Sequence, residues 1–149
     1  MDRYFDLGGY SFPVTTQSAE AQTWFDRGIL WTYGYNHEEA VTCFKRAIDA
    51  DPKCAMAHWG AGYAAGPNYN MPWDLFDYAG RTAAARAGYA HARKALDLID
   101  GVTRWEAALI QALPARYPQS DPLNPEAMKA WNADFADAMR DVFAAHPES

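Results

Sequence analysis

Apolar residues recur at helical spacing along most of the chain, and the first such run follows Ser18. Trp24, Gly28 and Trp31 lie three or four residues apart, the period with which one face of an α-helix repeats. Ser18 suits the N-cap position, because its hydroxyl can accept a hydrogen bond from a free backbone N–H group. Gly34 ends the run. The pattern therefore predicts a helix between Ser18 and Gly34.

A second helical run follows at once and ends at a proline. Asn36 is a candidate N-cap, and Glu39, three residues later, fits the reciprocal half of a capping box. Pro52 stops the helix, because proline lacks the backbone N–H group and clashes with the preceding turn. One face of this helix carries Ala40, Phe44, Ala47 and Ile48. The two runs together predict an antiparallel helical hairpin.

The hairpin pattern then repeats with an interruption. Gly62 lies 34 residues after Gly28, and helical spacing resumes with Ala85. Gly62 and Ala85 are separated by 23 residues, against 12 for the corresponding positions of the first hairpin. The segment GPNYNMPWDLFDYAG accounts for the difference. We expect a second helical pair over residues 55–99, with an insertion near residues 67–80.

A third helical pair is predicted over residues 103–145. Thr103 and Glu106 fit a capping box, and Asn124 followed by Pro125 fits an N-cap with proline at the first helical position. The last helix carries one apolar stripe, formed by Met128, Trp131, Phe135, Met139 and Val142.

The composition supports an all-α fold. Alanine is the commonest residue and β-branched residues are scarce, a mixture that favours helices and lets them approach closely. A chain of 149 residues is long enough for one domain with a buried core. Residues 1–17 show no helical period, so we expect an extended arm there and a helical domain over residues 18–149.

The first hairpin resembles the tetratricopeptide repeat (TPR). The matching positions are, in order, Trp24, Gly28, Trp31, Ala40, Phe44, Ala47 and Pro52. In this pattern we expect Trp24 and Phe44 to fill the space between the two helices. Arg27 departs from the pattern, since the repeat usually has leucine there. The run FDRGILWTYGYNHEEAVTCFKRAIDADPKCAMAHWGAGYAAGPNYN also resembles the N-terminal portion of longer bacterial TPR-containing proteins. The resemblance implies a right-handed stack of three helical hairpins, with repeat one at residues 21–54 and repeat two at residues 55–99.

Charge and composition argue against several function classes. The net charge is −6 and the chain has no run rich in lysine or arginine, so we expect no nucleic-acid partner. No apolar segment approaches the ~20 residues that span a bilayer, and the first residues lack a signal-peptide pattern. Two cysteines, Cys43 and Cys54, are too few for a disulfide framework. We expect a reduced, cytoplasmic protein that binds no membrane, and we predict no cofactor.

The resemblance also implies a binding surface, because repeat arrays bind along the concave face lined by the first helix of each pair. The groove residues would be Phe25, Ile29, Tyr33, Met56, Trp59 and Tyr63, with Gln22 and Thr32 beside them. Such a groove is aromatic and nearly uncharged. It therefore suits an apolar protein segment or a companion subunit better than an acidic peptide. The alternative is that the arm, the insertion or a partner chain buries these aromatic residues.

Two further segments could contribute to binding. The insertion is too apolar for disorder, so we expect it to fold back as a lid over the groove or to form a docking patch. The stripe of the last helix suggests a surface for self-association or for a second protein. A weaker alternative is a carrier of an aromatic small molecule, which would quench the fluorescence of Trp59 and Trp73.

The runner-up function is an enzyme or a small enzyme subunit. Repeat geometry places the start of the second helix beside the head of the insertion. This brings together one imidazole, two carboxylates and two amides, from His37, Glu38, Glu39, Asn68 and Asn70. Such a cluster suits general acid–base chemistry or a mixed nitrogen and oxygen metal site. Capping, turn formation and solvated surface are the structural alternatives for the same residues.

Metal binding has two candidate starting points, neither of them complete. His37 and Glu38 would supply two ligands at the rim. Cys54 and His58 lie four residues apart and share a helix face, which would suit zinc or copper. A closed site needs three or four ligands, so packing is the favoured interpretation of this pair. His37 and His58 should lie roughly 20 Å apart, at opposite ends of the second helix, and so should not share one metal.

Overall fold

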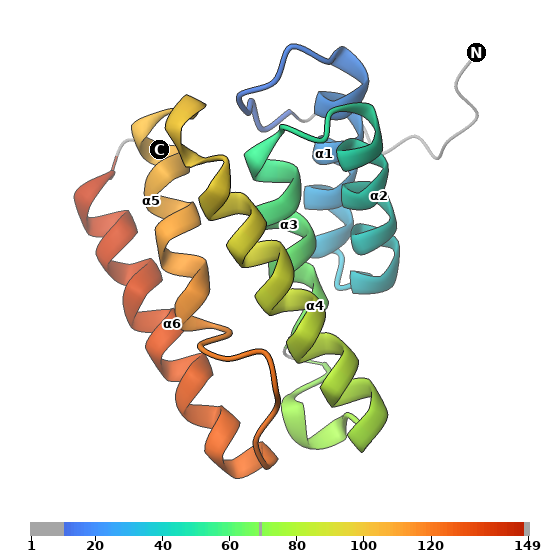
Figure 1. Ribbon diagram of the computed structural model, residues 1–149, viewed down its shortest axis with the longest axis vertical. Coiled ribbons are helices and arrows are strands. Elements are labelled where there is room, and N and C mark those ends of the chain that lie inside the picture. Colours follow the sequence, from blue (N-terminus) through green and yellow to red (C-terminus); the bar gives the residue numbers. More distant parts are fainter. Residues whose placement is uncertain (1–10, 69, 148–149) are drawn as a thin grey trace.

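The computed structural model describes residues 11–68 and 70–147, and within this part of the chain the fold is all-helical (Figure 1). The elements are α1 (Ala19–Tyr33), α2 (His37–Ala50), α3 (Ala55–Ala65), η1 (Trp73–Leu75), α4 (Tyr78–Asp97), η2 (Ile99–Gly101), α5 (Arg104–Ala112), η3 (Leu113–Ala115) and α6 (Pro125–Ala145). The extended pairing in the described residues is one isolated bridge between Asn68 and Met71. None of the described helices is long and apolar enough to cross a membrane.

The helices form three consecutive pairs. α1 packs against α2, α3 against α4, and α5 against α6, while α2 also packs against α3 (Figure 1). The expected helix starts are confirmed at Ser18, Asn36 and Asn124, whose side chains each accept a backbone N–H group of the first turn. The capping box of Thr103 and Glu106 is also confirmed. All-helical content and the positions of the elements thus follow the sequence pattern.

The capping box expected at Asn36 and Glu39 forms only in half. The Asn36 side chain accepts the Glu39 N–H group, but the Asn36 N–H group donates to the carbonyl of Trp31 at 2.9 Å. Tyr35 donates to Thr32 at 3.1 Å, which completes a Schellman-type ending of α1. Tyr35 holds a φ of 61°, a left-handed conformation that usually belongs to glycine. The tight ending therefore uses the N–H group that a full capping box would need.

The ring of Phe44 lies in a slot between two glycines of different helices. A Cβ atom at Gly28 of α1 or at Gly60 of α3 would lie 2.5 Å from an atom of this ring. Phe44 is on α2 and is almost fully buried. The close approach of α1, α2 and α3 therefore depends on the absence of a side chain at both glycines.

Tyr117 forms a second slot, which joins the third pair to the second. Its hydroxyl donates to the carbonyl of Gly62 at 2.6 Å, near the end of α3. A Cβ atom at Gly66 or Gly88 would lie 2.2 Å from an atom of Tyr117. Two buried aromatic rings thus hold the three pairs together, each one against glycine backbone.

The residue between the first two helices differs from the one expected. We predicted that Trp24 fills this space with Phe44, but the buried residue is Phe25, whose ring centroid lies 5.5 Å from that of Phe44. Trp24 is half-buried, and the guanidinium groups of Arg27 and Arg46 each lie 4.5 Å from its ring centroid. Arg27, the departure from the repeat pattern, thus packs on a tryptophan face instead of entering the core.

The insertion packs against the last helix. Trp73 is buried, with ring centroids of Phe76 and Trp131 at 5.3 and 6.3 Å. The apolar stripe of α6 is accordingly covered within the chain, since Met128, Trp131, Phe135 and Val142 are all buried. The prediction that α6 offers an association surface therefore loses the exposed stripe on which it was based.

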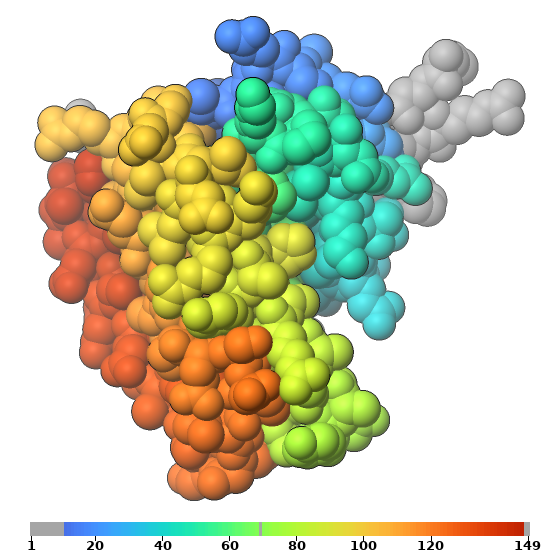
Figure 2. All heavy atoms as spheres, in the orientation of Figure 1, coloured from blue at the N-terminus to red at the C-terminus, as the bar shows by residue number. Residues whose placement is uncertain are grey.

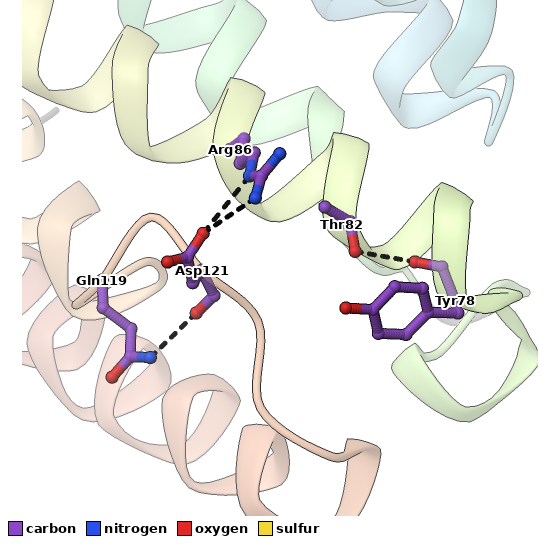
Figure 3. A network of polar contacts seen from close by, with 5 residues as sticks. All are labelled: Tyr78, Thr82, Arg86, Gln119 and Asp121. Atoms are coloured by element: carbon purple, nitrogen blue, oxygen red, sulfur yellow. Dashed lines mark hydrogen bonds and ion pairs between the residues drawn. The ribbon is translucent and has the colours of Figure 1, made fainter.

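On the face drawn in Figure 2, α4 lies beside the segment that connects α5 to α6. Arg86 of α4 and Asp121 of that segment form an ion pair at 3.1 Å, and the Gln119 side chain donates to the Asp121 carbonyl (Figure 3). Both partners of the pair are largely exposed, so it should contribute less than about 1 kcal/mol. Helix packing, and not this network, sets the arrangement of the pairs.

The Phe44 slot makes a stability prediction. Gly60→Ala should lower the free energy of unfolding by about 1–3 kcal/mol, because the added methyl group overlaps the Phe44 ring. Urea denaturation followed by circular dichroism measures the change. Gly34→Ala is the matched control, because its Cβ would meet its nearest neighbour at an ordinary 3.5 Å. Equal stability of the two variants would contradict the slot.

A second substitution separates overlap from other effects of alanine. Phe44→Leu shortens the ring side chain, so the double variant with Gly60→Ala should be more stable than the sum of the two single changes predicts. Strict additivity of the two changes would show that the methyl group and the ring do not compete for space.

Candidate functional site

A cleft with a volume of about 810 Å³ lies between α1 and α3 on one side and α5 and α6 on the other. The C-terminal half of α1 contributes Ile29, Thr32 and Tyr33. Trp59 and Tyr63 contribute from α3. The first helix of each pair therefore lines the cleft, and α6 adds a further wall.

Aromatic rings form the middle of the cleft. Trp59 and Tyr63 stack with a centroid distance of 5.3 Å and an angle of 16°. The Trp59 indole N–H group donates to the carbonyl of Leu109 at 3.0 Å, which fixes the ring against α5. Phe135 of α6 lies 6.0 Å from Tyr63, centroid to centroid. These contacts among α3, α5 and α6 fix the positions of the three rings.

One end of the cleft is apolar. Trp105 near the start of α5 and Phe143 near the end of α6 line it, with ring centroids 5.7 Å apart. Phe12 of the arm also lines the cleft. Phe143 is 52% exposed, so this end includes an aromatic side chain that the described residues leave open to solvent.

The other end of the cleft holds a buried cation. Arg116 follows η3 and is only 7% exposed. Its Nη2 atom donates to the carbonyls of Tyr63 at 3.1 Å and Pro67 at 2.6 Å, and its Nε atom donates to the Tyr117 hydroxyl at 3.2 Å. The guanidinium carbon also lies 5.1 and 5.3 Å from the ring centroids of Tyr63 and Phe135. Among the described residues no carboxylate forms an ion pair with it.

His37 and Asn68 line the cleft with Arg116. Burial lowers the pKa of His37, the Tyr35 backbone opposes this shift, and the positive charge of Arg116 lowers the pKa further. The imidazole is therefore mainly neutral at pH 7. Asn68 is held by a tight turn, in which its backbone pairs with Met71 and its side-chain oxygen accepts the Asn70 N–H group at 2.9 Å.

The arm packs on α1 beside the cleft, which Phe12 lines. The Phe12 ring packs 6.0 Å from that of Phe25, centroid to centroid. Asp26 accepts the Phe12 N–H group at 2.8 Å. The Gln22 side chain accepts the Val14 N–H group and donates to the Phe12 carbonyl, both at 2.9 Å. Residues 11–17 of the predicted arm thus lie on α1 without helix or strand, and residues 1–10 lie outside the described part.

Glu106 fastens the arm to α5. Its carboxylate accepts the Thr15 N–H group at 2.8 Å, the Thr15 hydroxyl at 2.5 Å and the Thr103 N–H group at 3.0 Å. Burial alone would raise the pKa of Glu106, but the hydrogen bonds from Thr15 and Thr103 outweigh it and hold the pKa below its usual value. The ionised carboxylate is the form that keeps the arm in place.

The residues predicted for binding, six in the groove and Trp73 in the insertion, divide between the cleft and the core. Four of them line the cleft, namely Ile29, Tyr33, Trp59 and Tyr63. The other three are fully buried or nearly so and do not line it, namely Phe25, Met56 and Trp73. Phe25 is covered by Phe12, as the alternative of burial by the arm anticipated. Trp73 packs on α6, so the insertion does not place it over the cleft as a lid.

The five residues of the predicted rim cluster do not all meet. His37 and Asn68 line the same cleft. Glu38 and Asn70 are exposed and do not line it. Glu39 accepts a long contact of 3.9 Å from the Cys43 thiol and also stands apart from the cleft. The structure therefore brings together one imidazole and one amide of the cluster, without its carboxylates.

The pair of Cys54 and His58 lies in the core. Cys54 occupies the N-cap position of α3 without a side-chain capping hydrogen bond, and burial raises the pKa of its thiol. His58 Nε2 lies 3.0 Å from the Pro52 carbonyl, and its ring centroid lies 6.1 Å from that of His91. Burial lowers the pKa of both imidazoles. No group of three or more histidine, cysteine, aspartate or glutamate side chains in the described ranges is placed to hold a metal ion.

Sequence reasoning missed Arg116 and Tyr35. Arg116 carries the charge of the cleft, yet nothing in its local sequence distinguishes it from a surface arginine. Tyr35 is 59% exposed and lines the cleft because the tight ending of α1 turns it there. The useful signal was positional. The predicted groove used the first helix of only the first two pairs. The first helix of the third pair, α5, also lines the cleft and could have been included by the same rule.

We compared the chain with protein-family models, with curated proteins and with solved structures, and none of them matches it.

The attachment of the arm makes a prediction. Glu106→Gln should lower the free energy of unfolding by about 1.5–3 kcal/mol at pH 7, because hydrogen bonds to a charged acceptor are lost. Because folding lowers the pKa of Glu106, its stabilisation is present above its unfolded value of 4.5 and is lost as the pH falls through the lower folded value. The variant should therefore show a smaller loss of stability in acid.

Urea denaturation between pH 7 and pH 3 measures both effects. Asp134→Asn, which removes an exposed carboxylate on α6, is the control and should change stability by less than about 0.5 kcal/mol. If Glu106→Gln behaves like this control at every pH, the arm is not held by the Glu106 carboxylate.

Proposed function

We propose that this chain is a binding module that holds a small, largely apolar molecule in the cleft. The observation that carries the proposal is a cleft of about 810 Å³ whose walls are chiefly aromatic and aliphatic and come from all three helical pairs. Ligand sites of about 300–1,000 Å³ with mainly apolar walls and a few polar groups are the usual form of small-molecule pockets. The polar residues that line the cleft are Arg116, His37, Asn68 and Thr32, together with three tyrosines.

The shape of the cleft supports a compact ligand. Phe12 of the arm lies where a groove along the concave face would continue past Phe25. α6 stands opposite α1 and α3 as a second wall, with Phe135 and Met139 facing the cleft. A molecule that runs along the whole face would have to displace the arm. A molecule confined to the cleft would not.

A protein segment or companion subunit is the second candidate, and the arm itself favours it. The arm is an extended chain held through backbone groups by Gln22 and Asp26, so this face can bind extended backbone. Tyr33 is also 66% exposed at the edge of the cleft. A peptide carrying residues 11–17, added to a variant that lacks them, would test whether the face accepts a segment supplied from outside.

Two further predictions, the TPR-like arrangement of the helices and the enzyme alternative, are also proposals. A TPR-like right-handed stack is the arrangement we propose for the three pairs, supported by the spacing of Gly28 and Gly62. The enzyme alternative rests on His37 and Asn68, because they share the cleft with Arg116.

A neutral fluorescent probe tests whether the cleft takes an apolar molecule. N-phenyl-1-naphthylamine should bind with one-to-one stoichiometry and quench the emission of Trp59 and Trp105. At about −0.3 kcal/mol per non-hydrogen atom, its dissociation constant should be on the order of 100 µM or tighter.

Two variants of α6 locate the binding. Ala136 is exposed and lines the cleft, so Ala136→Trp should fill it and weaken probe binding about tenfold or more. Ala133 is exposed on the same helix and does not line the cleft, so Ala133→Trp should leave binding unchanged. An absence of saturable binding to the wild type, or equal binding to both variants, would reject the proposal.

A further inference from the structure

The charge of Arg116 is not balanced within the described part of the chain. Its Nε and Nη2 atoms make the hydrogen bonds given above, and its Nη1 atom makes none there. A buried cation is costly unless an anion or further hydrogen bonds compensate it. Arg116 is more than nine-tenths buried and lines the cleft, so an anion that pairs with its guanidinium could lie inside the cleft.

A structural role explains part of this arrangement. Tyr63 contributes one of the last carbonyls of α3, and Arg116 therefore caps the negative end of that helix. The helix end supplies partial charge only, and the surrounding rings of Tyr63 and Phe135 supply their faces. Within the described residues, no carboxylate forms an ion pair with this guanidinium.

The two ends of the cleft differ in polarity. Arg116, His37 and Asn68 form one end, and Trp105 and Phe143 lie at the other. Trp105 and Arg116 stand at opposite ends of α5 and η3, roughly 16 Å apart along the helix axis. A ligand that satisfies both ends has a charged head and an elongated apolar body.

We propose that the cleft binds a monocarboxylic acid with an elongated aliphatic or aromatic body, its carboxylate at Arg116 and its body directed toward Trp105. This inference rests on the proposed function and names the ligand class. A single negative charge fits better than a phosphate, because one guanidinium is the only fixed cation that lines the cleft in the described ranges. The two N–H groups of Nη1, which the described hydrogen bonds do not use, can donate to a carboxylate oxygen.

Two ligands of equal length test the head group without any change to the protein. Decanoate and 1-decanol carry the same ten-carbon body, and each can displace N-phenyl-1-naphthylamine from the cleft. Decanoate should bind about tenfold or more tightly than 1-decanol, because hydrogen bonds to a charged group are the stronger ones. If 1-decanol binds equally well or better, the carboxylate site is wrong.

A pair of single-atom substitutions tests where the head lies. Asn68→Asp places a negative charge at the polar end and keeps the side-chain oxygen that accepts the Asn70 N–H group. It should weaken decanoate binding about tenfold and leave the neutral probe within about twofold, since like charges repel. Asn70→Asp adds the same charge two residues away on an exposed side chain outside the cleft, and should have little effect on either ligand.

The outcomes separate this inference from the proposed function. If the neutral probe binds but decanoate shows no preference, or if both aspartate variants weaken decanoate equally, the carboxylate site fails and the apolar cleft stands. If neither ligand binds the wild type, both proposals fail. Arg116→Gln keeps a donor for the Tyr63 carbonyl and removes the charge, so where it folds it should abolish the preference for decanoate.

Discussion

The position of the Phe44 ring between Gly28 and Gly60 is the constraint on which the rest of the structure depends. The ring sets the separation of α1, α2 and α3. This separation determines the distance between the cleft residues of α1 and those of α3, Trp59 and Tyr63. Tyr117 does the same for the third pair, through its hydrogen bond to Gly62. The cleft is thus a consequence of two rings packed on bare backbone.

The same packing places a charge where an apolar pocket would otherwise form. Arg116 is adjacent to Tyr117 in sequence, so the slot that buries the tyrosine also carries the guanidinium to the end of α3. The arm acts at the opposite side, where Phe12 covers Phe25 and Glu106 holds Thr15. A surface that a repeat array would leave open becomes a cavity with one polar and one apolar end.

The helices could be predicted from the sequence, but most of the residues that form the site could not. Helical spacing and caps such as Ser18 and Thr103 are local signals, and they located the helices correctly. Which aromatic residue of α1 is buried depends on the rotation of the helix about its axis, which residue spacing does not specify. For that reason Trp24 was expected in the core, whereas Phe25 is the residue buried there. Arg116 and the contact of Trp73 with α6 depend on residues far apart in sequence, which a spacing rule does not specify.

The orientation of a bound acid in the cleft is the sharpest test of the proposed ligand site. Isotope-edited nuclear Overhauser spectra of the chain with carbon-13-labelled decanoate would report which protons of the ligand lie near which side chains. We expect one orientation, with contacts from the methylene group beside the carboxylate to the Tyr63 and Phe135 rings, and from the terminal methyl group to Trp105. The reverse orientation, or contacts confined to residues outside the cleft, would contradict it.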